Sequence, residues 1–344
     1  MRKTIDTNFF RIGAEQPCYV IAEIGSNHNG NFDMACEMIE KAAAAGVNAV
    51  KFQTFKAKEH YSKKTPKIGL YKEGIYELIE KLEIDRTWHS KLAAVCSRSK
   101  IDFLDSPCDH EAINIAVSVG MPLIKIASYD MVDVRLVSEI ARTGKSVMFS
   151  TGMSTTAEIE AAVNICRSNN NDNIIILQCT SLYPAPAHLS NLKAMHTIAN
   201  MFNVITGYSD HTLGDHIPCA AVAMGAKVIE KHYTLGRGLP GPDHNFAIEP
   251  EELKIMMERI RDIESAIGDG IKNGPRAEEM ELFTKARRSI IAKNKISKGQ
   301  VIAEGDIVIK RPGMGIHPSQ IALVVGKKAL QDIDEDEPIT WEMI

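Results

Sequence analysis

Eight short apolar runs, rich in β-branched residues, alternate with longer amphipathic stretches along residues 1–270 of the chain. The runs have the composition of buried strands, and the stretches between them repeat apolar residues at helical spacing. Strands that alternate with helices form a parallel sheet covered by helices, and eight such units close into a TIM (β/α)8 barrel. The strands are expected at YVIAEIG (19–25), NAVKFQTF (48–55), IDFLDSP (101–107), PLIKIAS (122–128), SVMFSTG (146–152), IIILQCT (174–180), NVITGYSD (203–210) and AKVIEKHYT (226–234). The helices are expected at 33–45, 109–119, 132–143, 155–167, 189–201, 214–224 and 251–267.

An open, doubly wound sheet is the structural alternative to the barrel. Such a sheet usually carries a glycine-rich G-x-G-x-x-G turn after its first strand. The corresponding segment here, AEIGSNHNG, does not match that pattern. The barrel is therefore favoured. Asp33, Asp109 and Ser154, the last with Glu158 one turn on, are the expected N-caps of three helices.

The alternation of strands and helices ends near residue 267. The Gly-rich, polar segment that follows is typical of a linker, and the last part of the chain is short and β-rich. About 60 residues bury only a small apolar core on their own, so this part is expected to pack against a larger domain. The expected domains are a barrel over 1–270, a linker over 271–286 and a small β-rich domain over 287–344.

Polar residues follow the ends of nearly all the expected strands. In a barrel these ends meet at one face, where the loops build the active site. Side chains alternate across a strand, so Glu230 and His232 share one face, while Lys231 takes the other. Buried unpaired charge is costly, which makes a shared site at the barrel mouth the better explanation. The polar residues are Glu23, Asn27, His28, Lys51, Gln53, Asp105, Ser106, Lys125, Ser128, Ser150, Thr151, Gln178, Thr180, Ser181, Tyr183, Ser209, Asp210, His211, Glu230 and His232.

Two histidines follow the last two strands, which are neighbours in the expected barrel. The imidazoles of His211 and His232 can share one metal ion, with Glu23, water and substrate oxygens completing its coordination. Two histidines alone do not identify the metal.

Two lysines and two serines at other strand ends form a cradle for anions. Lys51, Lys125, Ser128 and Ser150 suit a phosphate together with a carboxylate. Glu23 and Glu230 can transfer protons. The mouth thus offers a Lewis acid, a site for a phosphorylated acid, and acid/base groups.

Composition excludes several other classes of protein. The formal net charge of −4 gives no indication of nucleic-acid or anionic-membrane binding. No stretch is apolar for long enough to span a bilayer, and the first residues lack the apolar core of a signal peptide. The seven scattered cysteines include no C-x-x-C pair, which indicates reduced thiols. These features predict a soluble cytoplasmic protein.

A set of motifs, in this order and at these spacings, resembles the sialic acid (nonulosonic acid) synthases. The barrel part contributes AEIGSNHNG, VKFQTF, KIAS, STGM, CTSLYPAP, GYSDHTLG, EKHYTL and GPDH. The last part, with KGQVIAEGDIVIKRPGMGI and LVVGKK, resembles the antifreeze-like (SAF) domain that ends those enzymes. The resemblance covers nearly the whole chain.

The resemblance implies a TIM barrel followed by a SAF domain, in a domain-swapped homodimer where each SAF domain covers its partner's active site. It implies condensation of phosphoenolpyruvate with an open-chain N-acetylated hexosamine, such as N-acetylmannosamine. The products would be a nine-carbon 2-keto sugar acid and phosphate. It also implies one divalent metal ion, Mn²⁺ or Mg²⁺.

The family's functional residues transfer to this chain position by position. His211 and His232 match the metal ligands, and Glu23 matches the carboxylate that handles proton transfer. Arg311 matches the SAF arginine that reaches across the dimer toward the N-acetyl group. The positions around phosphoenolpyruvate are Lys51, Ser106, Lys125, Ser128, Ser150 and Ser209. Gln53 lies on the same face as Lys51, and the sugar-side positions are Tyr183, Glu230 and Asp243.

The chain departs from some bacterial members of the family on the sugar side. They have Asn at Ser181 and Glu at Asp130, and residues 60–80 do not match their sugar-contacting loop. Legionaminic or pseudaminic acid synthesis from a 2,4-diacetamido-6-deoxy hexose is therefore an alternative. Further alternatives are a synthase of a shorter 3-deoxy sugar acid and a non-catalytic ice- or sugar-binding protein. An amidohydrolase would need an H-x-H on its first strand, which IAEIG lacks.

Overall fold

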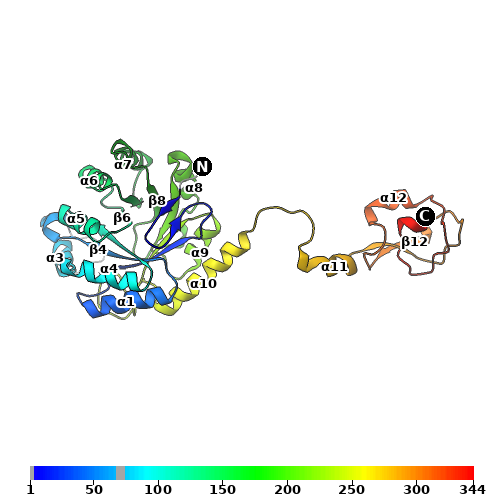
Figure 1. The fold of residues 1–344 in the computed structure, drawn as a ribbon, viewed down its shortest axis with the longest axis horizontal. Helices are drawn as coiled ribbons and strands as arrows, with labels where there is room; N and C mark the ends of the chain where they lie inside the picture. The colour runs from blue at the N-terminus through cyan, green and yellow to red at the C-terminus, as the bar shows by residue number, and fades with distance from the viewer. Residues whose placement is uncertain (1–3, 67–73) are drawn as a thin grey trace. The chain divides into compact units, whose positions relative to one another are not determined.

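A computed structural model describes residues 4–66 and 74–344, which fall into two compact units, Met1–Gly268 and Asp269–Ile344. The first unit contains eight parallel strands with helices around them (Figure 1). They lie in the order β5-β4-β3-β10-β9-β8-β7-β6, and β5 and β6 lie side by side to complete the ring. This confirms the predicted barrel. Its strands are β3 (Tyr19–Gly25), β4 (Ala49–Thr54), β5 (Asp102–Pro107), β6 (Leu123–Ile126), β7 (Ser146–Ser150), β8 (Ile174–Cys179), β9 (Ile205–Asp210) and β10 (Val228–His232).

Helices cover the outside of the barrel, and the seven predicted ones are all present. The helices of this unit are α1 (Phe32–Ala44), α2 (Ala57–His60), α3 (Ile75–Lys81), α4 (His89–Arg98), α5 (His110–Ser118), α6 (Val134–Arg142), α7 (Thr156–Ser168), α8 (Ala194–Phe202), α9 (His216–Ala223) and α10 (Pro250–Ile267). Those between β4 and β5 were not predicted. In α4 the buried residues His89, Leu92, Val95 and Cys96 do recur at helical spacing.

The predicted N-caps are right in one case and shifted in two. Asp109 caps α5, its side chain accepting a backbone N–H of the first turn. Asn31 rather than Asp33 caps α1, and Thr155 rather than Ser154 caps α7. Asn31 lies two residues before the predicted cap and Thr155 one residue after it, and each has the extended backbone that a cap requires.

The N-terminal end of the barrel is closed by a small hairpin, β1 (Ile5–Asp6) and β2 (Arg11–Ile12), which was not predicted. Ile5 and Ile12 pack into the apolar cluster inside the strands, together with Tyr19 and Leu104. Asp102 accepts hydrogen bonds from the Tyr19 hydroxyl at 2.7 Å and from a hairpin backbone N–H at 3.1 Å. With this end filled, the opposite end of the barrel is the one that carries polar side chains.

The second unit is built on the antiparallel pair β11 (Ser289–Ala292) and β12 (Ile307–Lys310), with α12 (Ile321–Val324) and several isolated bridges. Its own apolar core is small and rich in isoleucine. Residues 271–286, predicted as a linker, contain a short 3₁₀ turn and α11 (Met280–Lys285). The three-part domain division stays a prediction.

In the described residues, none of the helices combines the length and the apolar character needed to cross a bilayer. All seven cysteines lie in the described part of the chain and are free thiols.

Candidate active site

Four charged side chains meet at the C-terminal mouth of the barrel, each at most 5% exposed: Glu23, Lys51, Lys125 and Glu230. They come from β3, β4, β6 and β10. Lys51 Nζ lies 2.8 Å from Glu23 Oε2 and 3.8 Å from Glu230 Oε2, while Lys125 Nζ lies 3.6 Å from Glu230 Oε1. The register of the parallel strands explains this meeting, because Glu23 pairs with His232 on one side and with Lys51 on the other.

Burial and the neighbouring charges shift the pKa values of the two carboxylates in opposite directions. Burial raises the pKa of Glu23 to about 7, even though Lys51 opposes the shift. For Glu230, burial is outweighed by Lys125 and Lys51, so that its pKa is lowered. Near neutral pH, Glu23 can therefore gain or lose a proton while Glu230 stays ionised, which is the division expected of an acid/base pair.

The pKa values of the two lysines are also shifted in opposite directions. Burial acts against the charge of Lys51, but Glu23 and Glu230 outweigh it and raise its pKa. At Lys125 burial prevails over the attraction of Glu230, and the pKa is lowered. An anion bound between them would favour the charged form of Lys125.

Hydroxyl and amide groups complete this network. Lys51 Nζ donates to Ser106 Oγ at 3.1 Å, Ser209 Oγ donates to Glu230 Oε1 at 3.0 Å, and Gln53 Nε2 donates to Glu23 Oε1 at 2.6 Å. Ser150 Oγ is buried and has no hydrogen-bond partner among the described residues. A buried hydroxyl left in this state is typical of a site that a polar ligand fills.

Close backbone approach shapes the rim between β6 and β8. The Gly152 N–H donates to Ser128 Oγ at 2.9 Å. A Cβ at Gly152 would lie 2.1 Å from Ser181 Oγ, so any other residue here would require the Ser181 side chain to shift. Ser181 Oγ is itself buried and has no hydrogen-bond partner among the described residues.

Beside the charged network, two imidazoles face each other across the ends of β9 and β10. The ring centroids of His211 and His232 lie 5.3 Å apart. Tyr183 packs 4.2 Å from the His211 ring, and Phe246 packs 5.0 Å from the His232 ring. Asp243 Oδ2 lies 3.7 Å from His232 Nδ1.

These imidazoles fit a divalent metal ion. His232 Nδ1 is buried and makes no hydrogen bond with any of the described residues, and burial followed by repulsion from His211 lowers the pKa of His232 well below its usual value. His232 is therefore neutral, as a ligand must be. His211 Nδ1 lies 2.8 Å from the Thr180 carbonyl, which favours a proton on Nδ1 and leaves Nε2 free to coordinate. Contacts with Cys179 and this carbonyl outweigh burial and raise the pKa of His211, so protons compete with the metal there.

A buried ion pair holds the backbone on both sides of His211. Lys231 Nζ lies 2.5 Å from Asp210 Oδ2 and donates to the Thr212 carbonyl at 2.7 Å. Asp210 Oδ1 accepts the Thr212 N–H at 3.0 Å. Lys231 directly precedes His232, so the pair ties the end of β10 to the segment after β9 that carries His211.

The structure thus brings together the predicted site residues that belong to the first unit. Arg311 lies in the second unit, where its Nε donates to the Ala286 carbonyl at 2.6 Å, and its predicted role stays a prediction. Phe246 was not predicted, because it lies in the long loop after β10 with no strand to mark it. Residues 67–73 of the unmatched sugar-side segment lie outside the described residues. Those brought to the mouth are Glu23, Lys51, Gln53, Ser106, Lys125, Ser128, Ser150, Tyr183, Ser209, His211, Glu230, His232 and Asp243.

Known proteins resemble both parts of this chain. The sequence model of the NeuB family matches residues 38–272, and that of the SAF domain matches residues 287–344. The N,N'-diacetyllegionaminic acid synthase of Campylobacter jejuni is 41% identical over 93% of this chain and 98% of its own length. Its counterpart of the same name in Legionella pneumophila is 36% identical over 96% of this chain and 96% of its own. The crystal structure of N-acetylneuraminic acid synthetase from Leptospira borgpetersenii has a TM-score of 0.75 at 34% identity, covering 82% of this chain and 95% of that one.

Proposed function

The chain belongs to the NeuB family of nonulosonic acid synthases, and on that premise we propose that it condenses phosphoenolpyruvate with an open-chain N-acetylated hexosamine. Water is consumed, and a nine-carbon 2-keto sugar acid and phosphate are released. The observation that carries this proposal is the buried Lys51–Glu23–Glu230–Lys125 network beside a pair of imidazoles. A non-catalytic sugar-binding protein would have no need of such a costly group of buried charges.

Phosphoenolpyruvate would bind on the lysine side of the mouth. Lys51 and Lys125 would hold its phosphate and carboxylate and stabilise the charge that grows as the C–O bond breaks. The unpaired Ser150 hydroxyl, which is buried at the end of β7, would donate to one of these oxygens. Ser106, Ser128 and Ser209 would complete the binding of the substrate.

The sugar aldehyde would lie at the imidazole side. His211 and His232 would hold Mn²⁺ or Mg²⁺, which when bound draws electron density from the aldehyde oxygen. Tyr183, Glu230 and Asp243 would position the sugar. Burial raises the pKa of Asp243 to about 6, so this carboxyl can also donate a hydrogen bond in part of the population.

Glu23 would handle the protons of the reaction. After the enol carbon has attacked the aldehyde, C2 of the former phosphoenolpyruvate becomes oxocarbenium-like and takes up water. With a pKa of about 7, Glu23 can accept the proton of that water, and Lys51 at 2.8 Å stabilises the ionised form that does so. The tetrahedral intermediate then loses phosphate.

For the sugar, we propose a 2,4-diacetamido-6-deoxy hexose of the legionaminic acid type. The two full-length relatives at 41% and 36% identity carry that product in their names. N-acetylmannosamine is the alternative, supported by the 34% identical N-acetylneuraminic acid synthetase. The departures at Asp130 and Ser181 from some sialic acid synthases agree with a different sugar side.

The remaining parts of the proposal concern assembly. We propose a domain-swapped homodimer in which Arg311 of the second unit acts in the partner's site, and we propose that the enzyme works in the cytoplasm. Loss of turnover and of sugar affinity in Arg311→Ala would support the exchanged domain. Unchanged values of both would contradict it.

The reaction is tested by incubating the protein with Mn²⁺, phosphoenolpyruvate and each candidate hexosamine in turn, and by measuring phosphate release. Release with one sugar only would establish the reaction and identify the substrate. If no sugar supports release, or if release survives in Glu23→Gln, the proposed mechanism is wrong. Sugar binding without release would instead support the binding-protein alternative.

A further inference from the structure

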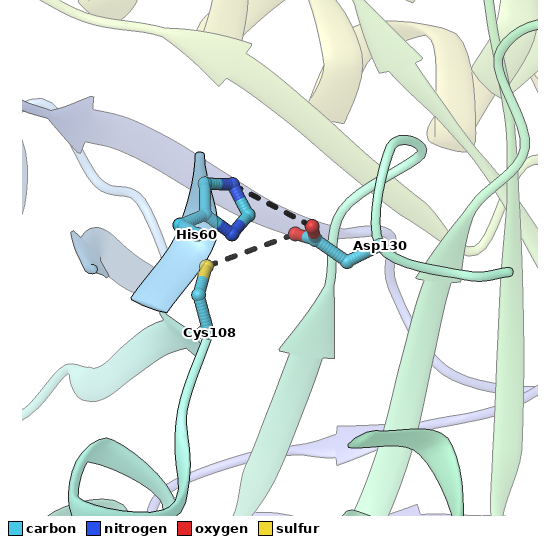
Figure 2. Close-up of side chains that lie close together, drawn as sticks. All are labelled: His60, Cys108 and Asp130. Carbon is cyan, nitrogen blue, oxygen red and sulfur yellow. Dashed lines mark hydrogen bonds and ion pairs between the residues drawn. The ribbon is translucent and has the colours of Figure 1, made fainter. Parts of the chain in front are cut away.

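A second group of potential metal ligands lies in the segments that follow β4, β5 and β6. Figure 2 shows the side chains of His60, Cys108 and Asp130 pointing toward one another, His60 from the end of α2 and the other two from loops. His60 Nε2 lies 3.6 Å from Asp130 Oδ1, and Cys108 Sγ lies 3.7 Å from Asp130 Oδ2. In the order of strands around the barrel, β5 and β6 lie opposite β9 and β10, which carry His211 and His232. The cluster is therefore separate from the imidazole pair.

The spacing of these atoms suits a tetrahedral ion. With zinc–ligand distances of about 2.0 to 2.3 Å, neighbouring ligand atoms in a tetrahedral site lie roughly 3.5 Å apart. One ligand atom from each of the three residues lies within 4.8 Å of the others. A small rotation of the Asp130 carboxylate would bring all three to one ion, with water in the fourth position.

The ligands are oriented by their surroundings. The His60 ring stacks on Phe55 with an interplanar angle of 16° and meets the Tyr61 ring edge-on at 4.8 Å. Cys108 Sγ lies 3.7 Å from the Ser106 carbonyl at the end of β5. His60 is thus held by two neighbouring rings, and Cys108 lies against the backbone at the end of β5.

The local electrostatic field also favours a cation. Burial, followed by the charges of Asp130 and Asp105, raises the pKa of the Cys108 thiol well above its usual value, and burial also raises the pKa of Asp130. Asp109 is paired with Arg86, so the carboxylates that act on the thiol without an arginine partner are Asp105 and Asp130. A divalent ion would compensate this negative charge.

We propose that His60, Cys108 and Asp130 bind a borderline-soft divalent cation of the Zn²⁺ type. One nitrogen, one sulfur and one oxygen ligand match zinc chemistry, whereas Mg²⁺ and Mn²⁺ prefer oxygen. On binding, the Cys108 thiol loses its proton to solvent and coordinates as the thiolate. This site goes beyond the proposed synthase reaction, and it uses Asp130, a residue that the proposal places on the sugar side of the mouth.

Co²⁺ is the probe of choice, because a thiolate ligand to Co²⁺ gives a charge-transfer band in the near ultraviolet. We expect the full-length protein to develop this band with about one equivalent of Co²⁺ at the thiolate site. Cys108→Ser should abolish the band, and His60→Gln should lower the Co²⁺ affinity by at least about tenfold. Circular dichroism of each variant checks that it remains folded.

Two control variants separate this site from the imidazole pair. The band should persist in His211→Ala, and also in Cys179→Ser, where the thiol 3.9 Å from His211 has been removed. Absence of the band, or its loss in Cys179→Ser but not in Cys108→Ser, would overturn the proposal. Because no substrate is present, the result is read independently of phosphate release, and either proposal can fail alone.

Discussion

The buried ion pair between Lys231 and Asp210 allows a quantitative test of what stabilises the segments that carry His211 and His232. Lys231→Met keeps the apolar length of the side chain but removes the ammonium group that lies 2.5 Å from Asp210 Oδ2. Asp210, which is 1% exposed, would be left with its two bonds from Thr212 and no counter-charge. Breaking a buried pair by removing one partner costs about 3–5 kcal/mol, and we expect a loss of that size in the free energy of unfolding of the barrel.

A second variant supplies the control for this cost. Asp210→Asn combined with Lys231→Met keeps the acceptor for the Thr212 N–H but leaves no buried charge, and it should recover about half of the loss. Urea unfolding followed by the helical circular dichroism signal measures both values, since all but two of the α-helices in the described residues lie in the first unit. A single variant that loses less than about 1 kcal/mol, or a double variant as unstable as the single one, would refute the reasoning. Mn²⁺ affinity of the folded variants should fall by about 10- to 100-fold, because the loops that carry the two imidazoles loosen.

Three further predictions concern the mouth of the barrel. Glu23→Gln should lower kcat by about 10²–10⁴-fold. A base must be ionised, so kcat/KM of the unchanged protein should fall as the pH drops through about 7, and this limb should vanish in the variant. His232→Ala should abolish Mn²⁺ binding measured by electron paramagnetic resonance while leaving the barrel folded. Ser150→Ala should raise KM for phosphoenolpyruvate by about tenfold at unchanged stability, since its hydroxyl has no hydrogen-bond partner in the part of the chain that the structure describes. A loss of stability with unchanged KM would show that the hydroxyl is structural.

The strand ends could be predicted because two regularities meet there. Side chains alternate along each strand, and parallel strands bring their C-terminal ends to one face, so the meeting of Glu23, Lys51 and Glu230 follows from the sequence pattern. The same alternation predicted that Lys231 faces away from Glu230. Its pairing with Asp210 depends on the register between β9 and β10, which the pattern of either strand alone does not contain.

Loops were the part that the sequence did not predict. The position of Phe246 beside His232 depends on the conformation of a loop, and loops have no periodicity. The same holds for the segments that bring together His60, Cys108 and Asp130. The helices between β4 and β5 were missed for a different reason. The apolar residues of α4 do recur at helical spacing. The segment between β4 and β5 is long and begins with polar residues, so the helical spacing near its end was overlooked.

The four buried charges at the mouth sum to zero, with two lysines facing two carboxylates. Binding of the phosphoenolpyruvate anion gives this site a net negative charge. That charge is costly because the dielectric constant of a buried site is low. The divalent ion that His211 and His232 would hold beside this network can supply the missing positive charge. Binding of Mn²⁺ and binding of phosphoenolpyruvate should therefore reinforce each other, so that the Kd for phosphoenolpyruvate falls when Mn²⁺ is present. The ion would in this way leave Glu23 free to stay ionised, as the base for the attacking water must be.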